Sequence, residues 1–462
     1  MNISNKYPNY SIKLRRKAKI SPPETAFVLT LLFILLGYMY LGKGFAYLHI
    51  PIGFPLYVGE IVLGFGLLAA ALRPGMLINA LSTTPGKIYA CFFTWGMIRT
   101  LPYINRFGIT AGRDSALYYY GIFMLLVYGV IRKRRQIIRI TVLYAKPASL
   151  YVFWVPVAFF LYNFARDYLP RIPGTDLSIL IFKYDIVIHL TGAIAFFALF
   201  SGVFTKKKVR KRNVLWYILA VLSCILMMGR SSYLTLICGF TVMVFLNGIK
   251  KSIRPLAGFI LAITLLFLII PNITSPYLMS EISPEVVVGL TKSIFTDVDD
   301  PRFRQGTKVW RLMWWKMIID ETVFGPYFWT GRGFGENLAD VHGFLSSDPE
   351  KLVRPLRSPH NSHMTVLSRM GVPGFLLWII FHAVLVKRFY SGWRRARRAG
   401  DRFLQGVFAW VLCFWVAFMV NSMFDMTFEG PHGAIWFWSV MGLGLAVNKK
   451  SIRNSESDVK ST

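Results

Sequence analysis

The residues best suited to catalysis lie at the end of the only long polar stretch of the chain, which runs from 271 to 361. This stretch ends in SPHNSH, in which His360 is followed by Asn361 and then by an apolar run. A neutral imidazole near pH 7 can accept a proton from a hydroxyl nucleophile. His360 is therefore the candidate catalytic base, with His363 one helical turn further on as its support. A capping or interfacial role is the alternative for His360.

Three arginines are candidates for binding an anion. Arg230 lies in MMGRSSYL between two apolar runs, so we expect it at the end of a tight helical hairpin, where Ser231 and Ser232 begin the next helix. Arg311 lies in the tryptophan-rich segment TKVWRLMWWKMIID, and Arg332 lies in the glycine-rich segment GPYFWTGRGFGEN. A guanidinium presents a planar fork that binds phosphate through two hydrogen bonds. The alternative for Arg230 is extension to the membrane interface, and for the other two it is an ordinary solvated charge.

Neither a metal nor another cofactor is predicted. The acidic segment from Asp297 to Asp300 has a spacing that can hold a metal, but acidic turns of this kind are common. The pattern GRGFG, from Gly331 to Gly335, is too weak to indicate a nucleotide-binding loop. We therefore expect the chemistry to rely on the histidine and arginine side chains.

The composition indicates an all-α, polytopic membrane protein. Of the 462 residues, 55% are hydrophobic and 16% aromatic, and the mean hydropathy is +0.48, which is far more apolar than a soluble protein of this length requires. About 20 apolar residues cross a bilayer as a helix. Such runs predict about twelve transmembrane helices, near 25–41, 53–72, 86–101, 115–131, 149–165, 184–204, 214–229, 231–248, 253–271, 364–386, 403–423 and 431–448.

The positions of lysine and arginine predict the orientation, because cytoplasmic loops retain positive charge. With the N-terminus in the cytoplasm, all the strongly basic connections fall on the cytoplasmic side, at 132–139, 206–211, 250–254, 387–398 and 448–453. The net charge of +31 is then mostly a consequence of topology, and no nucleic-acid partner is predicted.

These boundaries divide the chain into four parts. They are a transmembrane bundle (1–271), a large outer loop with short helices, one of them interfacial (272–363), three last transmembrane helices (364–448) and a cytoplasmic tail (449–462). Both termini are expected in the cytoplasm, and His360 is expected to face outward.

Several polar residues fall in or near the outer halves of the predicted helices, where each costs a few kcal/mol unless it faces water or a partner. They are Glu60, Arg99, Asp185, His189, Arg230, Arg369, Asn421 and Asp425. Their common depth predicts a polar cavity that opens outward beneath the long loop. Glu60 and Arg369 are taken as supporting residues of that cavity, with structural pairing as the alternative for each.

The segments RLMWW (311–315), GPYFWTGRGFGEN (325–337) and SPHNSHMTVLSRMGVPGF (358–375) resemble the shared domain of the O-antigen ligase and polysaccharide polymerase family. The resemblance covers about residues 214–440. Its most specific part is formed by His360, Asn361, Leu367, Gly371 and Gly374. It implies a fold of about twelve helices, an essential loop histidine and two arginines on a diphosphate.

By this resemblance the histidine is His360, with Asn361 beside it, and the two arginines are Arg230 and Arg311, with Arg332 as a third. Arg369 departs from the pattern, since many members have an acidic residue there, and this leaves acceptor recognition open.

The resemblance implies an inverting, metal-independent glycosyltransferase of the bacterial inner membrane. Its partners would be a polyprenyl-diphosphate-linked glycan donor, a glycan or lipid-core acceptor and the lipid bilayer. The cations would stabilise the charge that develops on the leaving phosphate. Ligation of a finished glycan and polymerisation of repeat units both remain open. The rival from another class is a flippase or exporter of the same lipid-linked glycan. Transporters often have two related halves and a midplane site, and the sequence shows neither.

Overall fold

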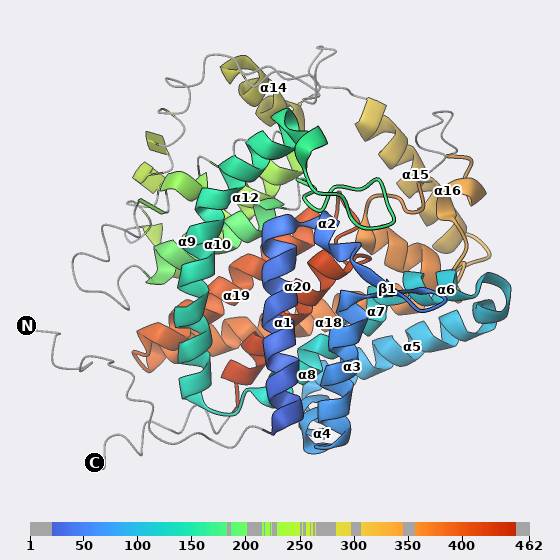
Figure 1. Ribbon diagram of the computed structural model, residues 1–462, viewed down its shortest axis with the longest axis horizontal. Coiled ribbons are helices and arrows are strands. Elements are labelled where there is room, and N and C mark those ends of the chain that lie inside the picture. The colour runs from blue at the N-terminus through green and yellow to red at the C-terminus, as the bar shows by residue number, and fades with distance from the viewer. Residues whose placement is uncertain are drawn as a thin grey trace, which may run out of the picture.

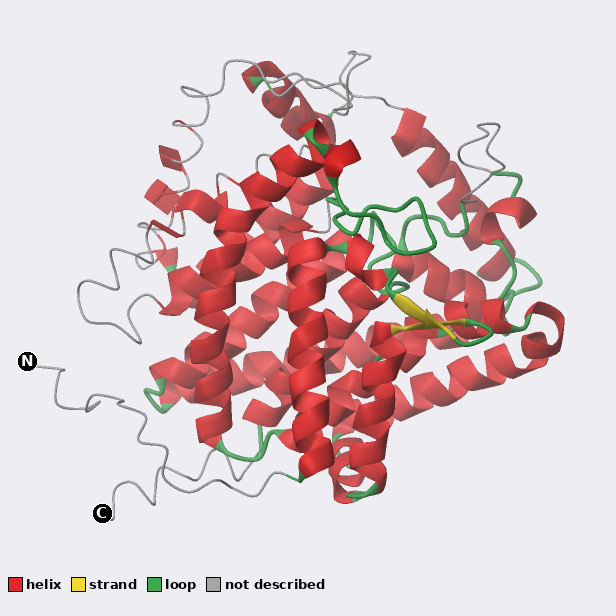
Figure 2. Ribbon diagram, viewed as in Figure 1, coloured by secondary structure: helices red, strands yellow, loops and turns green. Residues whose placement is uncertain are grey.

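The computed structural model describes residues 21–182, 186–200, 229–249, 283–296, 306–344 and 356–449, together with 215, 216, 218–221, 223, 252, 256–258, 260, 261 and 264. Nearly all of this part is helical, with one short β-hairpin (Figures 1 and 2). The elements in chain order are α1 (Pro22–Leu41), α2 (Lys43–Ala46), β1 (His49–Pro51), β2 (Pro55–Tyr57), α3 (Val58–Ala71), α4 (Gly75–Leu81), α5 (Thr84–Phe107), α6 (Ile109–Asp114), α7 (Ala116–Tyr119), α8 (Ile122–Val130), α9 (Arg134–Phe164), η2 (Arg166–Tyr168), α10 (Ile186–Phe200), α12 (Arg230–Asn247), α14 (Pro284–Phe295), α15 (Gly306–Thr322), α16 (Leu338–Val341), α18 (Ser362–Arg398), α19 (Arg402–Asn421) and α20 (Pro431–Val447).

The C-terminal helices form the centre of the bundle. Every residue of α20 from Gly433 to Val447 is buried, as expected for a helix that is apolar on all sides and surrounded by other helices. α20 packs against α8, α19 and α1, and α19 packs against α12, α18 and α10. α1 lies at the outside of the bundle (Figure 1) and exposes large apolar side chains such as Leu29 and Phe33. An aliphatic and aromatic outer surface of this kind suits contact with lipid.

Five of the described helices are long and apolar enough to cross a membrane, namely α1, α9, α12, α18 and α19. α3 and α4 make a sixth if they count as one span, with a bend of 97° between them. The prediction of a mostly helical membrane protein is confirmed, and the number of twelve crossings stays a prediction. Ten of the twelve apolar runs fall on described helices. The runs near 214–229 and 253–271 lie partly outside the described residues.

Two helices extend further than the apolar pattern indicated. α9 begins at Arg134 and α18 continues to Arg398, so most of the basic runs 132–139 and 387–398, predicted as connections, are helical. Lysine and arginine are good helix formers, and a helix can continue beyond its apolar part with its basic turns in water. Hydropathy marks the apolar part of such a helix and not its end.

Basic residues gather at one end of the bundle, the end where α1 begins and where α4 lies (Figure 1). The buried carboxylate of Glu24, in the first turn of α1, pairs with Arg132 and, at 3.0 Å, with Arg73. Arg134 pairs with Asp401 at 2.7 Å. α1 runs from this end to the opposite one, where it is followed by α2.

The stretch predicted as the outer loop contains α14, α15 and α16. One face of α15 packs against α18 and the segment around α16, with Trp314 and Ile318 fully buried beside Leu338. The opposite face of α15 exposes Leu312 and Met313. The domain boundaries and the interfacial position of this helix stay predictions, and the acidic segment 297–300 lies outside the described residues.

Candidate active site

His360 is held in an unusual backbone conformation. Its φ of +50° is the one positive value among the non-glycine residues that the structure describes. Trp315 of α15 donates its indole N–H to the carbonyl oxygen of Pro359 at 3.0 Å, and the ring of Trp310 meets the imidazole edge-on with centroids 5.9 Å apart. On the other side Asn361 caps α18 by accepting two backbone N–H groups of its first turn, at 3.0 and 3.2 Å. A non-glycine residue in this region costs on the order of 1–3 kcal/mol and persists where its surroundings enforce it, which is common at functional sites.

Asp425 lies opposite the imidazole, in the segment between α19 and α20. Its Oδ1 is 3.7 Å from Nδ1 of His360, which is an electrostatic contact and too long for a hydrogen bond. The hydroxyl of Ser362 donates to the carbonyl oxygen of Asp425 at 3.3 Å and so ties the two segments together. Burial raises the pKa of Asp425, but the imidazole and the ammonium group of Lys43 outweigh burial and hold this pKa well below its usual range. An ionised carboxylate beside Nδ1 favours a proton on that nitrogen and leaves Nε2 as the basic one.

α18 is broken near its beginning, at Gly371, where φ is +66° and ψ is −172°. A Cβ at this position would lie 2.6 Å from the carbonyl oxygen of Phe328. The break frees backbone groups, and the glycine-rich loop binds them: the N–H of Arg332 donates to the oxygen of Ser368 at 2.7 Å, and that of Val372 donates to Phe328 at 2.8 Å. The glycines of both segments therefore allow two backbones to approach closely.

Arg369 helps to hold this junction. Its side chain is 3% exposed, and its guanidinium reaches Oδ2 of Asp114 in α6 at 2.9 Å and the carbonyl oxygen of Gly333 at 3.1 Å. Arg357 and the N–H of Gly335 contact the same carboxylate oxygen, each at 3.1 Å. Asp114 thus connects α6, the glycine-rich loop and α18. Arg369, the residue that departs from the family pattern, uses its donors within the protein.

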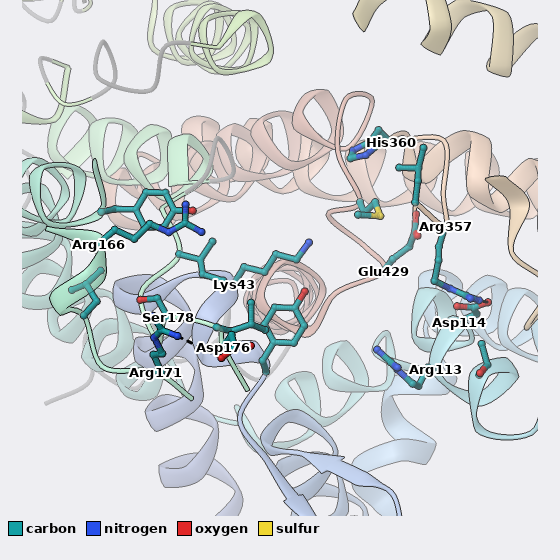
Figure 3. Close-up of a pocket in the computed structure, with 18 of the residues that line it drawn as sticks. Lys43, Arg113, Asp114, Arg166, Arg171, Asp176, Ser178, Arg357, His360 and Glu429 are labelled. Carbon is teal, nitrogen blue, oxygen red and sulfur yellow. Dashed lines mark hydrogen bonds and ion pairs between the residues drawn. The ribbon is translucent and has the colours of Figure 1, made fainter. Parts of the chain in front are cut away.

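A cavity of about 740 Å³ opens beside His360. This volume is within the range of roughly 300–1,000 Å³ that small-molecule sites occupy. The walls come from α2, α6, the end of α9 with the turn that follows it, and the segments before α18 and α20 (Figure 3). The six cationic lining residues are Lys43, Arg113, Arg166, Arg171, Arg357 and Arg369. The four acidic ones are Asp114, Asp167, Asp176 and Glu429. The excess of cations suits an anionic ligand.

Glu429 is a lining residue that the sequence analysis missed. It precedes α20, and its Oε1 accepts a hydrogen bond from the hydroxyl of Thr365 at 2.8 Å. Burial raises the pKa of Glu429, although Thr365 and Arg369 act in the opposite direction. A carboxyl group in this position can exchange hydrogen bonds with the hydroxyl groups of a ligand in the cavity.

Five of the six cations were also missed, namely Lys43, Arg113, Arg166, Arg171 and Arg357. The sequence did carry a signal for them. They lie in segments predicted to be outside the cell, and arginine and lysine are usually scarce there. Lysine and arginine residues in outer loops therefore indicate a function other than setting the membrane orientation, and in this structure they line one cavity.

The three arginines predicted to bind an anion are absent from the described lining of this cavity. The guanidinium of Arg332 donates to Oε2 of Glu321 through Nε at 2.9 Å and through Nη2 at 2.6 Å. Arg311 lies on α15 with its guanidinium 5.5 Å from the ring of Trp310, on the helix that contacts His360. Arg230 is the half-buried first residue of α12. Arg332 is thus engaged in an ion pair. Among the three arginines, Arg311 is the one that lies on the helix in contact with His360.

Three supporting residues form contacts elsewhere. Nδ1 of His363 accepts the indole N–H of Trp378 at 3.0 Å, and Nε2 meets the hydroxyl of Ser422 at 2.9 Å. Oε1 of Glu60 accepts the hydroxyls of two neighbouring tyrosines at 2.8 and 2.6 Å. Asn361 is the helix cap described above. His360 and Arg369 are the predicted residues that the structure brings to the cavity.

Within the described residues, no three histidine, cysteine, aspartate or glutamate side chains come together in a way that could hold a metal ion. The apolar helices define a helical membrane protein, and the excess of cations in its cavity suits a polar, anionic ligand. Residues 193–379 match the family model described as O-antigen ligase, and this confirms the resemblance to that family. The matched stretch contains α12, α14, α15, α16, His360 and the break in α18. No curated protein matches the chain.

Proposed function

We propose that the protein is a membrane glycosyltransferase of the O-antigen ligase or polymerase type. It would move a glycan from a polyprenyl-diphosphate carrier to an acceptor hydroxyl in polysaccharide biosynthesis. The family match supports this type of activity. The observation that carries the proposal is that His360, facing Asp425, lies at a cavity lined by six cationic side chains.

His360 acts as the general base. Asp425 faces Nδ1, so Nε2 accepts the proton of the acceptor hydroxyl as its oxygen attacks the anomeric carbon. The bond between this carbon and the diphosphate oxygen breaks, and the diphosphate leaves with the electron pair. Attack from the face opposite the leaving group inverts the anomeric configuration. No metal or nucleotide takes part in this sequence of bonds.

The cations of the cavity stabilise the leaving diphosphate. Among the described residues, Lys43 and Arg113 have no carboxylate within ion-pair distance, although Lys43 also acts on Asp425 through space, so both side chains can bind a ligand. Figure 3 shows the side chain of Lys43 directed toward His360. The side chain of Arg357, which shares Asp114 with another arginine, is 36% exposed. These three groups are the ones best placed to hold a diphosphate beside the imidazole.

The three arginines implied by the family resemblance remain proposed ligands of the diphosphate, and the structure supports them to different degrees. Arg311 has the best support, because its helix contacts His360 through Trp310. Arg332 has the least, because its guanidinium already binds Glu321. Arg230 would need a ligand that extends to α12.

We also propose twelve membrane crossings in a bacterial inner membrane, with the parts 1–271, 272–363, 364–448 and 449–462 as bundle, outer loop, last helices and tail. The cavity would face outward and both termini the cytoplasm. The gathering of Arg132, Arg134 and Arg395 at the end of the bundle away from the cavity supports this orientation, because basic residues favour the cytoplasmic side.

The test is to reconstitute the purified protein and to add a polyprenyl-diphosphate glycan with candidate acceptors, without metal or nucleotide. Mass spectrometry of the products distinguishes the outcomes. A glycan joined to a lipid-core acceptor indicates a ligase, and a ladder of repeat units indicates a polymerase. Both products should be absent with His360→Ala. Movement of the intact lipid-linked glycan across the bilayer with no new glycosidic bond would contradict the proposal and indicate a flippase.

A further inference from the structure

A second wall of the cavity carries two arginines, Arg166 of η2 and Arg171 of the turn that follows, together with the carboxylates of Asp167 and Asp176. Figure 3 shows both arginines across the cavity from His360, Arg357 and Glu429, with Lys43 between the two sides. The proposed reaction uses Lys43, Arg113 and Arg357 and leaves this second wall without a role.

Backbone hydrogen bonds fix both η2, where the N–H of Leu169 donates to the oxygen of Arg166 at 3.2 Å, and the turn that follows it and carries Arg171. The N–H of Ile172 donates to the oxygen of Leu177 at 2.7 Å, and that of Ile179 donates to Pro170 at 2.9 Å. The turn also docks on α2, where a Cβ at Gly44 would lie 2.0 Å from the carbonyl oxygen of Ile179. The two guanidinium groups are therefore presented by an ordered part of the cavity wall.

Both guanidinium groups can accept an anion. Arg166 lies over the ring of Tyr162 at 5.2 Å, and it pairs with no carboxylate among the described residues. Arg171 meets Asp176 at 3.4 Å, but these side chains are 59% and 95% exposed, and an exposed pair of this kind contributes little. A bound anion can therefore replace Asp176 as the partner of Arg171. The buried pair of Arg369 on the opposite wall is far more firmly held.

The position of this wall determines which part of the substrates it faces. In the donor the diphosphate is bonded directly to the anomeric carbon that reacts, so it must lie near His360. A group on the opposite wall meets a part of a glycan that is remote from the reacting atoms. Arginine binds carboxylate and phosphate alike through its planar fork.

We propose that Arg166 and Arg171 form a subsite for an acidic sugar of the acceptor glycan, one that carries a carboxylate or a phosphate. The inference deepens the proposed function and rests on it, because only the proposed reaction identifies the bound glycan as the acceptor. The subsite selects acidic over neutral glycans and orients the acceptor so that its hydroxyl faces His360.

The test is a binding measurement by calorimetry on the full-length protein in nanodiscs of zwitterionic lipid. The probes are tetragalacturonide, maltotetraose bearing a 6-phosphate, unmodified maltotetraose and inorganic pyrophosphate. The wild-type protein should bind one or both acidic saccharides and should bind maltotetraose at least tenfold more weakly. The variant R166Q/R171Q should bind the acidic saccharide at least tenfold more weakly than the wild type, with unchanged affinity for pyrophosphate.

The matched control is R106Q/K316Q, which removes two exposed cations outside the cavity. It should bind all probes as the wild type does, and R166K/R171K should recover part of the affinity. The proposal is overturned if no acidic saccharide binds, if maltotetraose binds equally well, if R166Q/R171Q keeps wild-type affinity, or if it loses affinity for pyrophosphate instead.

Binding is measured without turnover, so this result is separate from the proposed function. His360→Ala should bind the acidic saccharide normally. If His360→Ala also transferred glycan at the wild-type rate, the proposed reaction would fail while the subsite remained.

Discussion

Replacing Asp425 by asparagine should slow glycan transfer about tenfold to a hundredfold. The change keeps the shape of the side chain and removes a negative charge 3.7 Å from Nδ1 of His360. At that separation, the imidazolium formed in the reaction and the carboxylate attract each other by about 4 kcal/mol at an effective dielectric constant of about 20, and by about 1 kcal/mol in bulk water. The two side chains are 26% and 29% exposed, so solvent screening brings the loss to about 1–3 kcal/mol.

The assay measures the transfer rate of the reconstituted protein over a series of donor concentrations up to saturation, by mass spectrometry of the released polyprenyl diphosphate. The rate should fall in Asp425→Asn, while the donor concentration that gives half the maximal rate stays the same. Asp320→Asn is the matched control, because it neutralises a carboxylate on the exposed surface of α15 that pairs with Lys316. Wild-type rates with Asp425→Asn would refute the assignment of Asp425 as the group that orients and stabilises the imidazole.

The remaining predictions concern the support of the site. Gly371→Ala should lower the free energy of unfolding by about 3 kcal/mol or more, because it combines a glycine-only backbone conformation with a Cβ 2.6 Å from the oxygen of Phe328. Glu321→Gln should destabilise the protein by about 3 kcal/mol, since it removes the carboxylate closest to the largely buried Arg332 and leaves only Glu336 at 3.7 Å. Burial raises the pKa of Glu321, but His342 and Arg332 outweigh it and lower the pKa below its usual range. The contribution of Glu321 to stability is therefore complete above a pH of about 4.3 and is lost as the pH falls below that value. Thermal unfolding in detergent, followed at a series of pH values, measures all three effects.

Controls of matched chemistry separate these effects from general damage. Gly343 also has a positive φ, of +73°, but a Cβ there would meet nothing within 4 Å, so Gly343→Ala should cost only about 1–2 kcal/mol. Equal losses of unfolding free energy at the two glycines would show that the close packing around Gly371 does not contribute to the destabilisation. For the acid dependence, Glu321→Gln should remove part of the stability difference between pH 6 and pH 4. An unchanged difference would show that Glu321 is not its source.

The sequence predicted the features that depend on neighbours along the chain. Apolar runs located most of the described helices. The cap of α18 is Asn361, whereas the sequence analysis considered a capping role for its neighbour His360. Helix ends were predicted poorly, because basic residues continue α9 and α18 beyond their apolar parts. His360 could be singled out because of its residue type and its place at the end of the polar stretch.

The rest of the site depends on packing between distant segments. Asp425 and Glu429 follow α19, and Lys43 follows α1. No local pattern shows that Asp425 faces His360 or that Glu429 and Lys43 line the same cavity as His360. Residue type alone also does not show that the guanidinium of Arg332 pairs with Glu321. An arginine indicates an anion nearby, but the anion can belong to the protein.

The central claim is that His360 removes the proton of the acceptor at a site that binds the donor without its help. The most direct measurement compares the single-turnover transfer rate and the donor affinity of wild-type protein and His360→Ala under the same conditions. The account predicts loss of at least 99% of the transfer rate, with donor affinity within about threefold of the wild type. Transfer by His360→Ala at the wild-type rate would contradict it.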